Sequence, residues 1–107
     1  MALQHVASAV IIGFTNPPTL DGNDGGFLAT TVDNGTGDYT ITLKEPLALS
    51  EASIQATIVT DFVPGATVNV RFDGGTSIRL KFYNAAGAAA DCSAAIVVAR
   101  RVTGRLP

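Results

Sequence analysis

Five basic side chains have the strongest potential for recognition in this sequence. Arg71, Arg79 and Lys81 alternate with apolar residues along two expected strands, and Arg100 and Arg101 stand near the C-terminus. Such alternation places the first three cations on one face of a sheet. Guanidinium and ammonium groups gathered in this way can bind the acidic groups of a partner. We therefore predict that all five residues face a partner protein, with a merely solvated sheet face as the alternative.

The sequence offers few residues for nucleophilic catalysis. The chain has one histidine, His5, and one cysteine, Cys92, and a catalytic pair needs both side chains within hydrogen-bonding reach. Nothing in the sequence holds the segment around His5 against Cys92. A single cysteine forms no intramolecular disulfide, and a structural zinc site needs several His or Cys ligands. We predict no catalytic residue and no cofactor.

One short segment, DGNDGG at residues 21–26, has the residue types of a metal site. The carboxylates of Asp21 and Asp24 are oxygen ligands of the kind that calcium prefers. An EF-hand loop would need a bidentate Glu at its twelfth position, where this sequence has Val32. Asp, Asn and Gly are also the residues of tight turns. A turn is the favoured interpretation, and a calcium site with Asp21 and Asp24 is the weaker alternative.

The composition favours a domain whose surface is partly covered by partners. The chain has 107 residues, of which 47% are apolar and 15% are charged, compared with about 25% charged residues in an average soluble domain. A net charge of −2 argues against a dedicated nucleic-acid binder. There is no apolar run of transmembrane length and no basic start of a signal peptide. We expect a soluble protein that folds in the cytoplasm without contacting a membrane.

Strand-like stretches recur between turn signals along the whole chain. They cover residues 8–14, 26–32, 38–44, 53–60, 66–72, 77–83 and 94–101. The segments 16–18 and 21–26 and the residue Pro46 are expected to interrupt pairing. This pattern predicts an all-β fold, a single antiparallel β-sandwich that is jelly-roll-like with about seven to eight strands. We expect a loose N-terminal arm over about residues 1–7 and a basic C-terminal tail over about residues 101–107.

Alternation along the strands assigns side chains to the core. The expected inward sets are Tyr39, Ile41 and Leu43; Ile54, Ala56 and Ile58; Val68, Val70 and Phe72; and Ile78, Leu80 and Phe82. The last strand is apolar at every position from 94 to 99. Alternation therefore leaves open whether Ile96 and Val98 or the set Ala95, Val97 and Ala99 points inward.

The length of the turn between residues 72 and 77 decides which residues of the two flanking strands pair with each other. A two-residue loop at Gly74 and Gly75 would place Arg71 opposite Ile78 and bring a cation to the core face. A loop of three or five residues pairs Val70 with Ile78 or with Leu80 instead. We predict an odd-length, glycine-containing turn with a bulge.

Two further segments leave a choice between loop and helix. Residues 84–95 are rich in alanine, which favours helix, but Gly87 interrupts them. We favour a loop there over a short helix. Residues 45–52 could hold one short helical turn.

The stretches GTGDYTITLKEPLALSEASIQATIV and TSIRLKFYNAAGAAADCSAAIVVAR occur in this order within residues 35–100. This order resembles small all-β virion proteins of tailed bacteriophages, namely capsid decoration or cement proteins and the related β-sandwich modules of head and tail fibres. The resemblance consists mostly of fold motifs. It implies a jelly-roll-like sandwich, homotrimers and a non-enzymatic role on the particle surface, and it carries over no catalytic residue.

We therefore expect a non-enzymatic phage virion structural protein. As a capsid decoration or cement protein it would dock on the capsid lattice as a trimer and stabilise it. Its partner would be the major capsid protein or another virion protein, and its location the capsid surface after folding in the host cytoplasm. The alternatives are a receptor- or glycan-binding module of a head or tail fibre and a small β-sandwich accessory domain of an enzyme. Missing catalytic groups disfavour the last, and the short segment before the first expected strand disfavours the fibre module.

Overall fold

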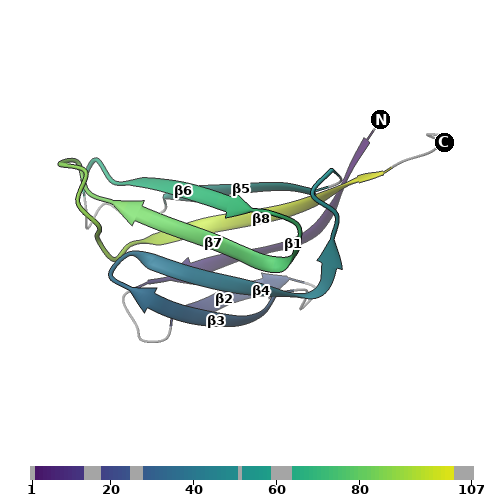
Figure 1. Cartoon of the computed structure of the whole chain (residues 1–107), viewed down its shortest axis with the longest axis horizontal. Helices are drawn as coiled ribbons and strands as arrows, with labels where there is room; N and C mark the ends of the chain where they lie inside the picture. The colour runs from purple at the N-terminus through teal and green to yellow at the C-terminus, as the bar shows by residue number, and fades with distance from the viewer. Residues whose placement is uncertain (1, 14–17, 25–27, 51, 59–63, 103–107) are drawn as a thin grey trace.

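The computed structural model describes residues 2–13, 18–24, 28–50, 52–58 and 64–102. All of its regular elements are antiparallel strands, arranged as two four-stranded sheets (Figure 1). The first sheet has the order β2-β1-β8-β5 and the second β3-β4-β7-β6. The strands are β1 (Ala2–Ile12), β2 (Thr19–Asp24), β3 (Leu28–Gly35), β4 (Asp38–Leu47), β5 (Ala52–Ile58), β6 (Thr67–Phe72), β7 (Gly75–Tyr83) and β8 (Ser93–Val102). The predicted all-β antiparallel sandwich is confirmed.

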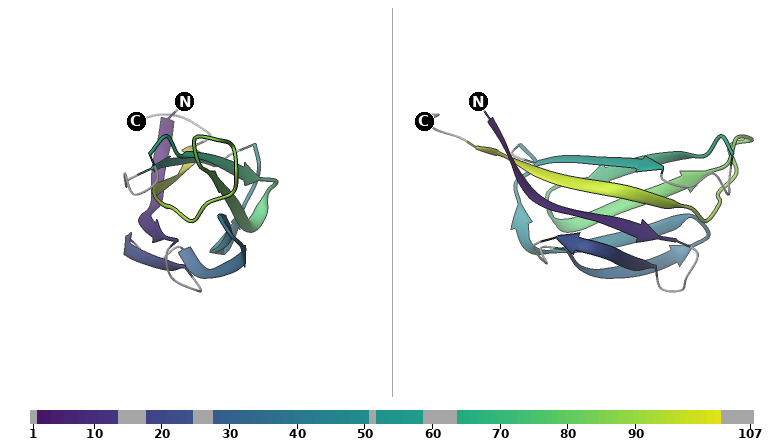
Figure 2. Two further views of the ribbon diagram at one scale, coloured as in Figure 1. Left: turned by 90° about the vertical axis from the view of Figure 1, so that its left-hand side faces the viewer. Right: turned by 180° about the vertical axis from the view of Figure 1, so that it is seen from behind.

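The two sheets form the layers of an elongated sandwich of 45 × 23 × 23 Å (Figure 2). β1 pairs with β8 in one sheet and β4 pairs with β7 in the other. The first and last strands are thus neighbours in one sheet, and consecutive strands pair within each sheet as β1-β2, β3-β4 and β6-β7. Because β1 begins opposite the end of β8, both ends of the paired chain lie at one end of the sandwich (Figure 1).

The core is built by the four central strands. The inward sets predicted for β4 and β7 are confirmed, since Tyr39, Ile41, Leu43, Ile78, Leu80 and Phe82 are all buried. The first sheet contributes mostly smaller side chains, Ala7, Ala9, Ile11, Ala94, Ile96 and Val98. The rings of Tyr39 and Phe82 lie 5.7 Å apart in a tilted arrangement. Large side chains of one layer thus pack against small side chains of the other, as close packing requires.

Burial also decides the orientation of the last strand. Ile96 and Val98 are fully buried, whereas Val97 is 41% exposed. Ile96 and Val98 therefore point inward, and Val97 points outward together with Ala95 and Ala99. The predicted inward sets of β5 and β6 are packed against the core but only half-buried, because both strands lie at sheet edges.

The turn between β6 and β7 has the predicted odd length and glycines, but the predicted bulge is wrong, since the register of the paired residues does not shift. Val70 pairs with Leu80 and Phe72 with Ile78, which leaves the five residues 73–77 as the connection. Gly74 and Gly75 in this connection have φ angles of 93° and 86°, which favour glycine. The same register places Arg71 directly opposite Arg79 on the outer face.

The ends of the chain differ from the prediction. β1 begins at Ala2, and Ala2 to His5 pair with Val102 to Ala99, so these residues are strand and the loose arm expected over 1–7 is wrong. Backbone pairing with β8 organises this segment, and side-chain alternation does not reveal such pairing. Arg101 belongs to β8 rather than to a tail, and residues 103–107 lie outside the described chain.

Two expected interruptions are also wrong. Residues 19–24 form the edge strand β2, where the register with β1 shifts between Ser8 and Val10 and Gly22 adopts a φ of 66°. A bulge at an edge strand accommodates turn-forming residues of this kind. Pro46 lies within β4, in the part where its register with β7 shifts, so no ladder hydrogen bond is required of it.

The alanine-rich connection between β7 and β8 is a loop, as favoured over helix. The side-chain oxygen of Asn84 accepts hydrogen bonds from the amides of Ala86 and Ala88, at 2.9 and 3.0 Å. These bonds, with Gly87 at a φ of 84°, fold the loop into a compact reversal. Residues 45–52 likewise contain no helix in their described part.

Candidate partner-docking face

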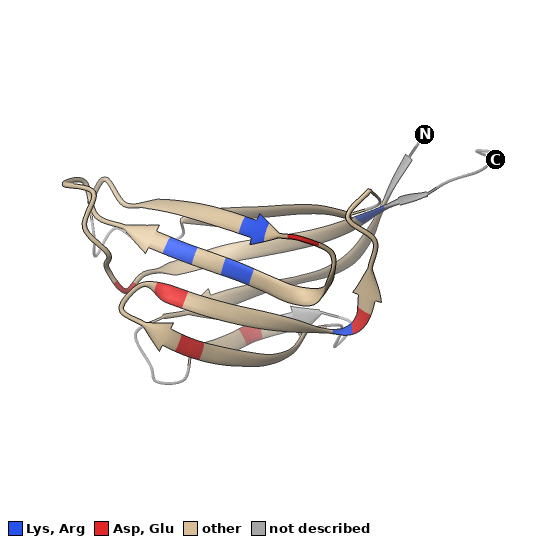
Figure 3. Cartoon of the chain, in the orientation of Figure 1, with Lys and Arg blue, Asp and Glu red and all other residues tan. Residues whose placement is uncertain are grey.

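The outer surface of the β3-β4-β7-β6 sheet carries the three cations that alternation predicted on one face. Arg71 on β6 lies opposite Arg79 on β7, and Arg79 lies opposite Thr40 on β4. Lys81 lies one outward position further along β7. Figure 3 shows these basic segments side by side on β6 and β7, with acidic segments on β4 and β3 beside them. We call this outer surface, defined by Arg71, Arg79, Lys81 and Thr40, the basic face.

Arg79 is fixed by a two-pronged ion pair across the sheet. Its Nε donates to Oδ1 of Asp38 at 2.9 Å, and its Nη2 donates to Oδ2 at 2.6 Å. The hydrogen bond from Arg79 holds the pKa of Asp38 below its usual range and raises the pKa of the guanidinium. The side chains are 46% and 20% exposed, so this pair orients the guanidinium without hiding it.

Arg71 is paired more loosely than Arg79. Its Nε donates to Oδ2 of Asp73 at 3.0 Å, and both side chains are at least 70% exposed. Like charges directly opposite each other destabilise a strand pair. The juxtaposition of Arg71 and Arg79 therefore has a cost in stability that the two carboxylates partly offset. Within the described chain Lys81 forms no ion pair within 4 Å, which leaves its ammonium group available to a partner.

Two hollows flank the arginine pair. One of about 420 Å³ is lined by Thr40, Arg71, Asp73, Gly74, Ser77 and Arg79. The other, of about 180 Å³, is lined by Asn69, Val70, Arg71, Arg79 and Lys81. Guanidinium groups beside hydroxyl groups supply the donors that bind carboxylate and other anionic groups. Carboxylate groups of a partner are thus one class of ligand that these donors could bind, in competition with Asp38 and Asp73.

Side-chain hydrogen bonds stiffen the neighbouring part of this sheet. Asn34 Nδ2 donates to Thr40 Oγ1 at 2.7 Å, and the Thr30 amide donates to Thr42 Oγ1 at 3.0 Å. These contacts join β3 to β4 on the outer side. The cations thus project from β7 and the edge strand β6, beside a β3-β4 pair whose strands are held together.

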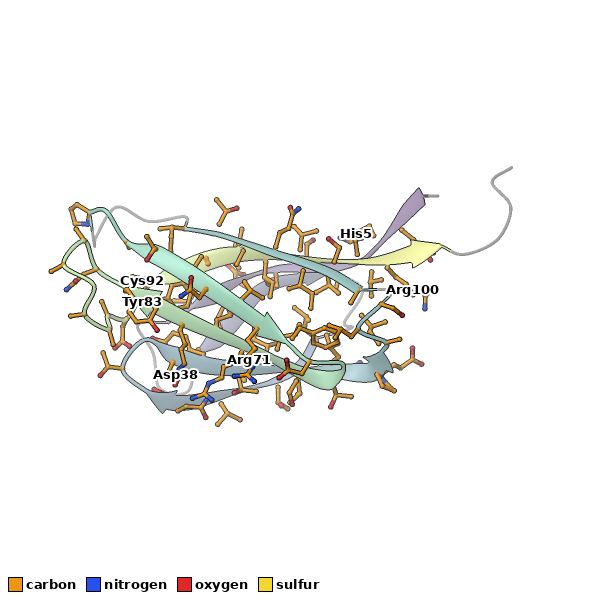
Figure 4. The ribbon with its side chains drawn as sticks, turned by 45° about the horizontal axis from the view of Figure 1, so that its top comes forward. His5, Asp38, Arg71, Tyr83, Cys92 and Arg100 are labelled. Carbon is orange, nitrogen blue, oxygen red and sulfur yellow. The ribbon has the colours of Figure 1, made fainter. Side chains whose placement is uncertain are left out.

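The remaining two predicted partner residues lie elsewhere. Arg100 is on β8 of the other sheet, where its Nη2 donates to Oε1 of Gln4 at 3.1 Å. Figure 4 shows Arg100 near the end of the sandwich where the chain begins, away from Asp38. Arg101 pairs with Leu3 in the same sheet, and its side chain lies outside the described residues. The structure gathers three of the five residues and separates the other two from them.

The residues with nucleophilic potential are far apart. His5 is exposed and pairs with Ala99, seven positions along β8 from Cys92. At about 3.3 Å per residue this spacing is about 23 Å. Cys92 is fully buried, and burial raises the pKa of its thiol. The arrangement does not form a Cys–His pair.

The candidate metal segment lies on an edge strand. Asp21 is exposed on β2 and pairs with Val10, and the backbone of Asp24 pairs with Ser8. Among the residues that the structure describes, there is no group of three or more His, Cys, Asp or Glu that could hold a metal ion. The side chain of Asp24 lies outside that set.

A polar network at one end of the sandwich was missed by the sequence reasoning. The hydroxyl of Tyr39 lies 2.8 Å from the carbonyl oxygen of Gly13 and 2.6 Å from Oδ1 of Asp91. The same Asp91 oxygen accepts a hydrogen bond from the Gly37 amide at 2.8 Å. Burial, followed by the hydrogen bond to Asp91, raises the pKa of Tyr39 far above its usual range. This network ties both sheets and the loop before β8 together.

Comparisons with protein-family models, with curated proteins and with solved structures give no match for this chain. In the described part of the chain, no helix is long and apolar enough to span a membrane. The candidate function therefore depends on the chemistry of the surfaces described above and on the family resemblance of the sequence.

Proposed function

We propose that this chain is a non-catalytic structural protein of a tailed-phage virion, a capsid decoration or cement protein that docks on the capsid lattice as a trimer. The resemblance of residues 35–100 to such proteins supports the proposal. The major capsid protein is the proposed partner.

The observation that carries the proposal is the basic face. Arg71 and Arg79 lie opposite each other although like charges at this distance cost stability. A surface that retains such a pair is expected to gain from it in binding. Arginine forks match carboxylate groups in geometry as well as in charge. An acidic patch of a capsid subunit has the chemistry that fits the basic face.

The capsid lattice repeats the same binding site many times, and this repetition compensates for the few contacts that one copy can make. A single sandwich side of this size offers few charged contacts, and exposed ion pairs contribute about 0–1 kcal/mol each. A trimer that engages three equivalent lattice sites binds them at high effective concentration. Modest individual contacts therefore suffice for stable docking.

The test is co-sedimentation of the purified chain with capsids of the phage that encodes it, prepared without this protein. We expect the wild-type chain to bind at saturable lattice sites, with affinity that falls as salt rises. The double variant Arg71→Glu/Lys81→Glu should lose binding because it reverses the charge of the basic face. The control Arg100→Glu, which reverses a single charge on the other sheet, should bind as the wild type does. Equal binding of all three proteins, or no binding of the wild type, would contradict the proposal.

The larger hollow favours a second candidate, a fibre module that binds an acidic glycan. Its volume of about 420 Å³ and its lining of Thr40, Ser77 and two arginines suit a carboxylated sugar. Binding of sialic acid or a uronic acid oligosaccharide to the wild type, and its loss in Ser77→Ala, would favour this candidate over the lattice protein. Glycan binding without capsid binding is the discriminating result.

A further inference from the structure

The outer surface of the β2-β1-β8-β5 sheet is apolar at its centre. Val10 and Ile12 project outward from β1, and Ala95, Val97 and Ala99 project outward from β8. Residues 6–12 and 93–99, which supply the middle of these two strands, contain no charged residue. We call the outward surface made by these five side chains the apolar face.

The apolar face contrasts with the outer surface of the other sheet. In their central parts β4 and β7 alternate between buried apolar residues and polar residues that are half-buried on β4 and exposed on β7, as expected of a sheet with one solvent-facing side. β1 and β8 are apolar on both sides, a pattern typical of strands that are covered on both faces. In the described chain only the inner side of β1 and β8 is covered by the core. A second covering layer is therefore expected.

We propose that this layer is a second copy of the same chain, so that identical chains associate through their apolar faces. The centre of the apolar face has no charged residue, and an exposed carboxylate, that of Asp21 on β2, lies at its edge opposite Val10. Identical chains can therefore meet at the centre of this face without repulsion between charges. The small side chains Ser8, Ala95 and Ala99 permit close approach around the protruding Val97. A hollow of about 280 Å³ beside Val97, lined in part by Ser8, Val10 and Asp21, offers space for a side chain of the neighbouring copy.

The size of this side of the molecule is sufficient for a stable interface. One long side of the 45 × 23 × 23 Å sandwich presents about 1,000 Å². A standard specific interface buries about 800 Å² on each partner. Around the apolar centre, Ser53, Gln55 and Thr57 of β5 are polar and uncharged, which corresponds to the polar rim of known interfaces.

The proposed function includes assembly of several copies, and the apolar face is the surface through which we infer that they meet. In that respect the inference rests on the proposed function. The two faces are on opposite sheets, so each can be altered alone. Self-association would leave the basic face of every copy on the outside of the assembly.

The test is sedimentation equilibrium of the full chain and of two matched variants. The wild type should sediment at a multiple of 11.0 kDa and not at the mass of one chain. Val97→Lys, on the apolar face, should reduce the mass to that of one chain, because it would bury an unpaired charge between copies. Val32→Lys is the control, since Val32 is 47% exposed on the opposite sheet and Val97 41% exposed. The control should assemble as the wild type does.

A second variant keeps the test informative if Val97→Lys does not fold. Thr57→Lys changes an exposed residue at the edge of the same sheet, and it should weaken association at least tenfold while circular dichroism is unchanged. A monomeric wild type, a Val97→Lys that assembles normally, or equal disruption by Val32→Lys would overturn the inference. The basic-face variant Arg71→Glu/Lys81→Glu should assemble normally yet fail to bind capsids, so failure of docking and failure of self-association are separate results.

Discussion

Tyr39 connects the two layers at one end of the sandwich through its hydroxyl group. Alternation along β4 correctly predicts that this residue points inward. The sequence gives no sign of its partners, since Asp91 is 52 positions away and Gly13 is 26 positions away. Contacts at such separations follow from the arrangement of the strands and cannot be inferred from local patterns.

Removal of the Tyr39 hydroxyl tests how much this hydrogen-bond network contributes to the free energy of unfolding. Tyr39→Phe should lower the free energy of unfolding by about 1–2 kcal/mol, because the buried carbonyl of Gly13 loses its donor. Urea denaturation monitored by circular dichroism measures this change. The control is Tyr83→Phe. Tyr83 is a half-buried tyrosine of β7 whose hydroxyl forms no hydrogen bond to the described chain. If both variants lose the same stability, the network does not contribute as argued.

The raised pKa of Tyr39 predicts an alkaline limit of stability. A tyrosine whose pKa is raised in the folded state contributes stability that is fully present below its unfolded pKa, about 10. That contribution declines as the pH rises above this value towards the higher folded pKa. The wild type should therefore lose unfolding free energy above about pH 10, measured by urea titration at each pH. In Tyr39→Phe the slope should be distinctly smaller, and an unchanged slope would assign the effect to other groups.

Gly37 is required for two separate reasons. Its φ is 66°, and a Cβ at this position would lie 2.6 Å from the Ala90 carbonyl oxygen. Gly22 has the same φ, but nothing lies within 4 Å of a Cβ there. We expect Gly22→Ala to cost about 1–2 kcal/mol and Gly37→Ala about 2–5 kcal/mol. Thermal unfolding of the two variants measures the difference, and equal costs would rule out the steric contribution.

The pairing of β6 with β7 brings two like charges, those of Arg71 and Arg79, opposite each other, and their repulsion lowers the stability of the fold. Arg71→Thr should leave stability unchanged or raise it by up to about 0.5 kcal/mol, because it removes a like charge opposite Arg79. Arg79→Thr should lower stability, since it breaks the two-pronged bond to Asp38. Both variants should weaken capsid binding in the co-sedimentation assay. A clear loss of stability in Arg71→Thr would show that this arginine serves the fold instead of a partner.

The elements themselves were predictable where side-chain alternation is strong. β4 and β7 were correctly placed because their inward and outward residues differ sharply, and the odd-length turn after β6 follows from keeping Arg71 out of the core. β2 was missed because its Asp, Asn and Gly residues are turn formers, and a bulge beside β1 accommodates them. The first residues of β1 were missed because partners on β8, nearly a hundred positions away, organise them.

The whole molecule presents two broad outer surfaces of opposite character. The basic face could be predicted in part, since three of its cations follow from alternation, whereas its separation from Arg100 required the sheet order. The apolar face could not be assigned, because the last strand is apolar on both sides and alternation gave no preference. Together the two faces describe a molecule suited to bind its own copies on one side and an acidic surface on the other.

The most direct test of the proposed docking is an image reconstruction of the phage capsid with this protein bound. We predict density for the sandwich at regular lattice sites, with Arg71, Arg79 and Lys81 directed at acidic residues of the capsid subunit. The β2-β1-β8-β5 sheets of neighbouring copies should face one another. An assembly with no basic face in contact with the capsid, or a particle that lacks the protein, would contradict the account.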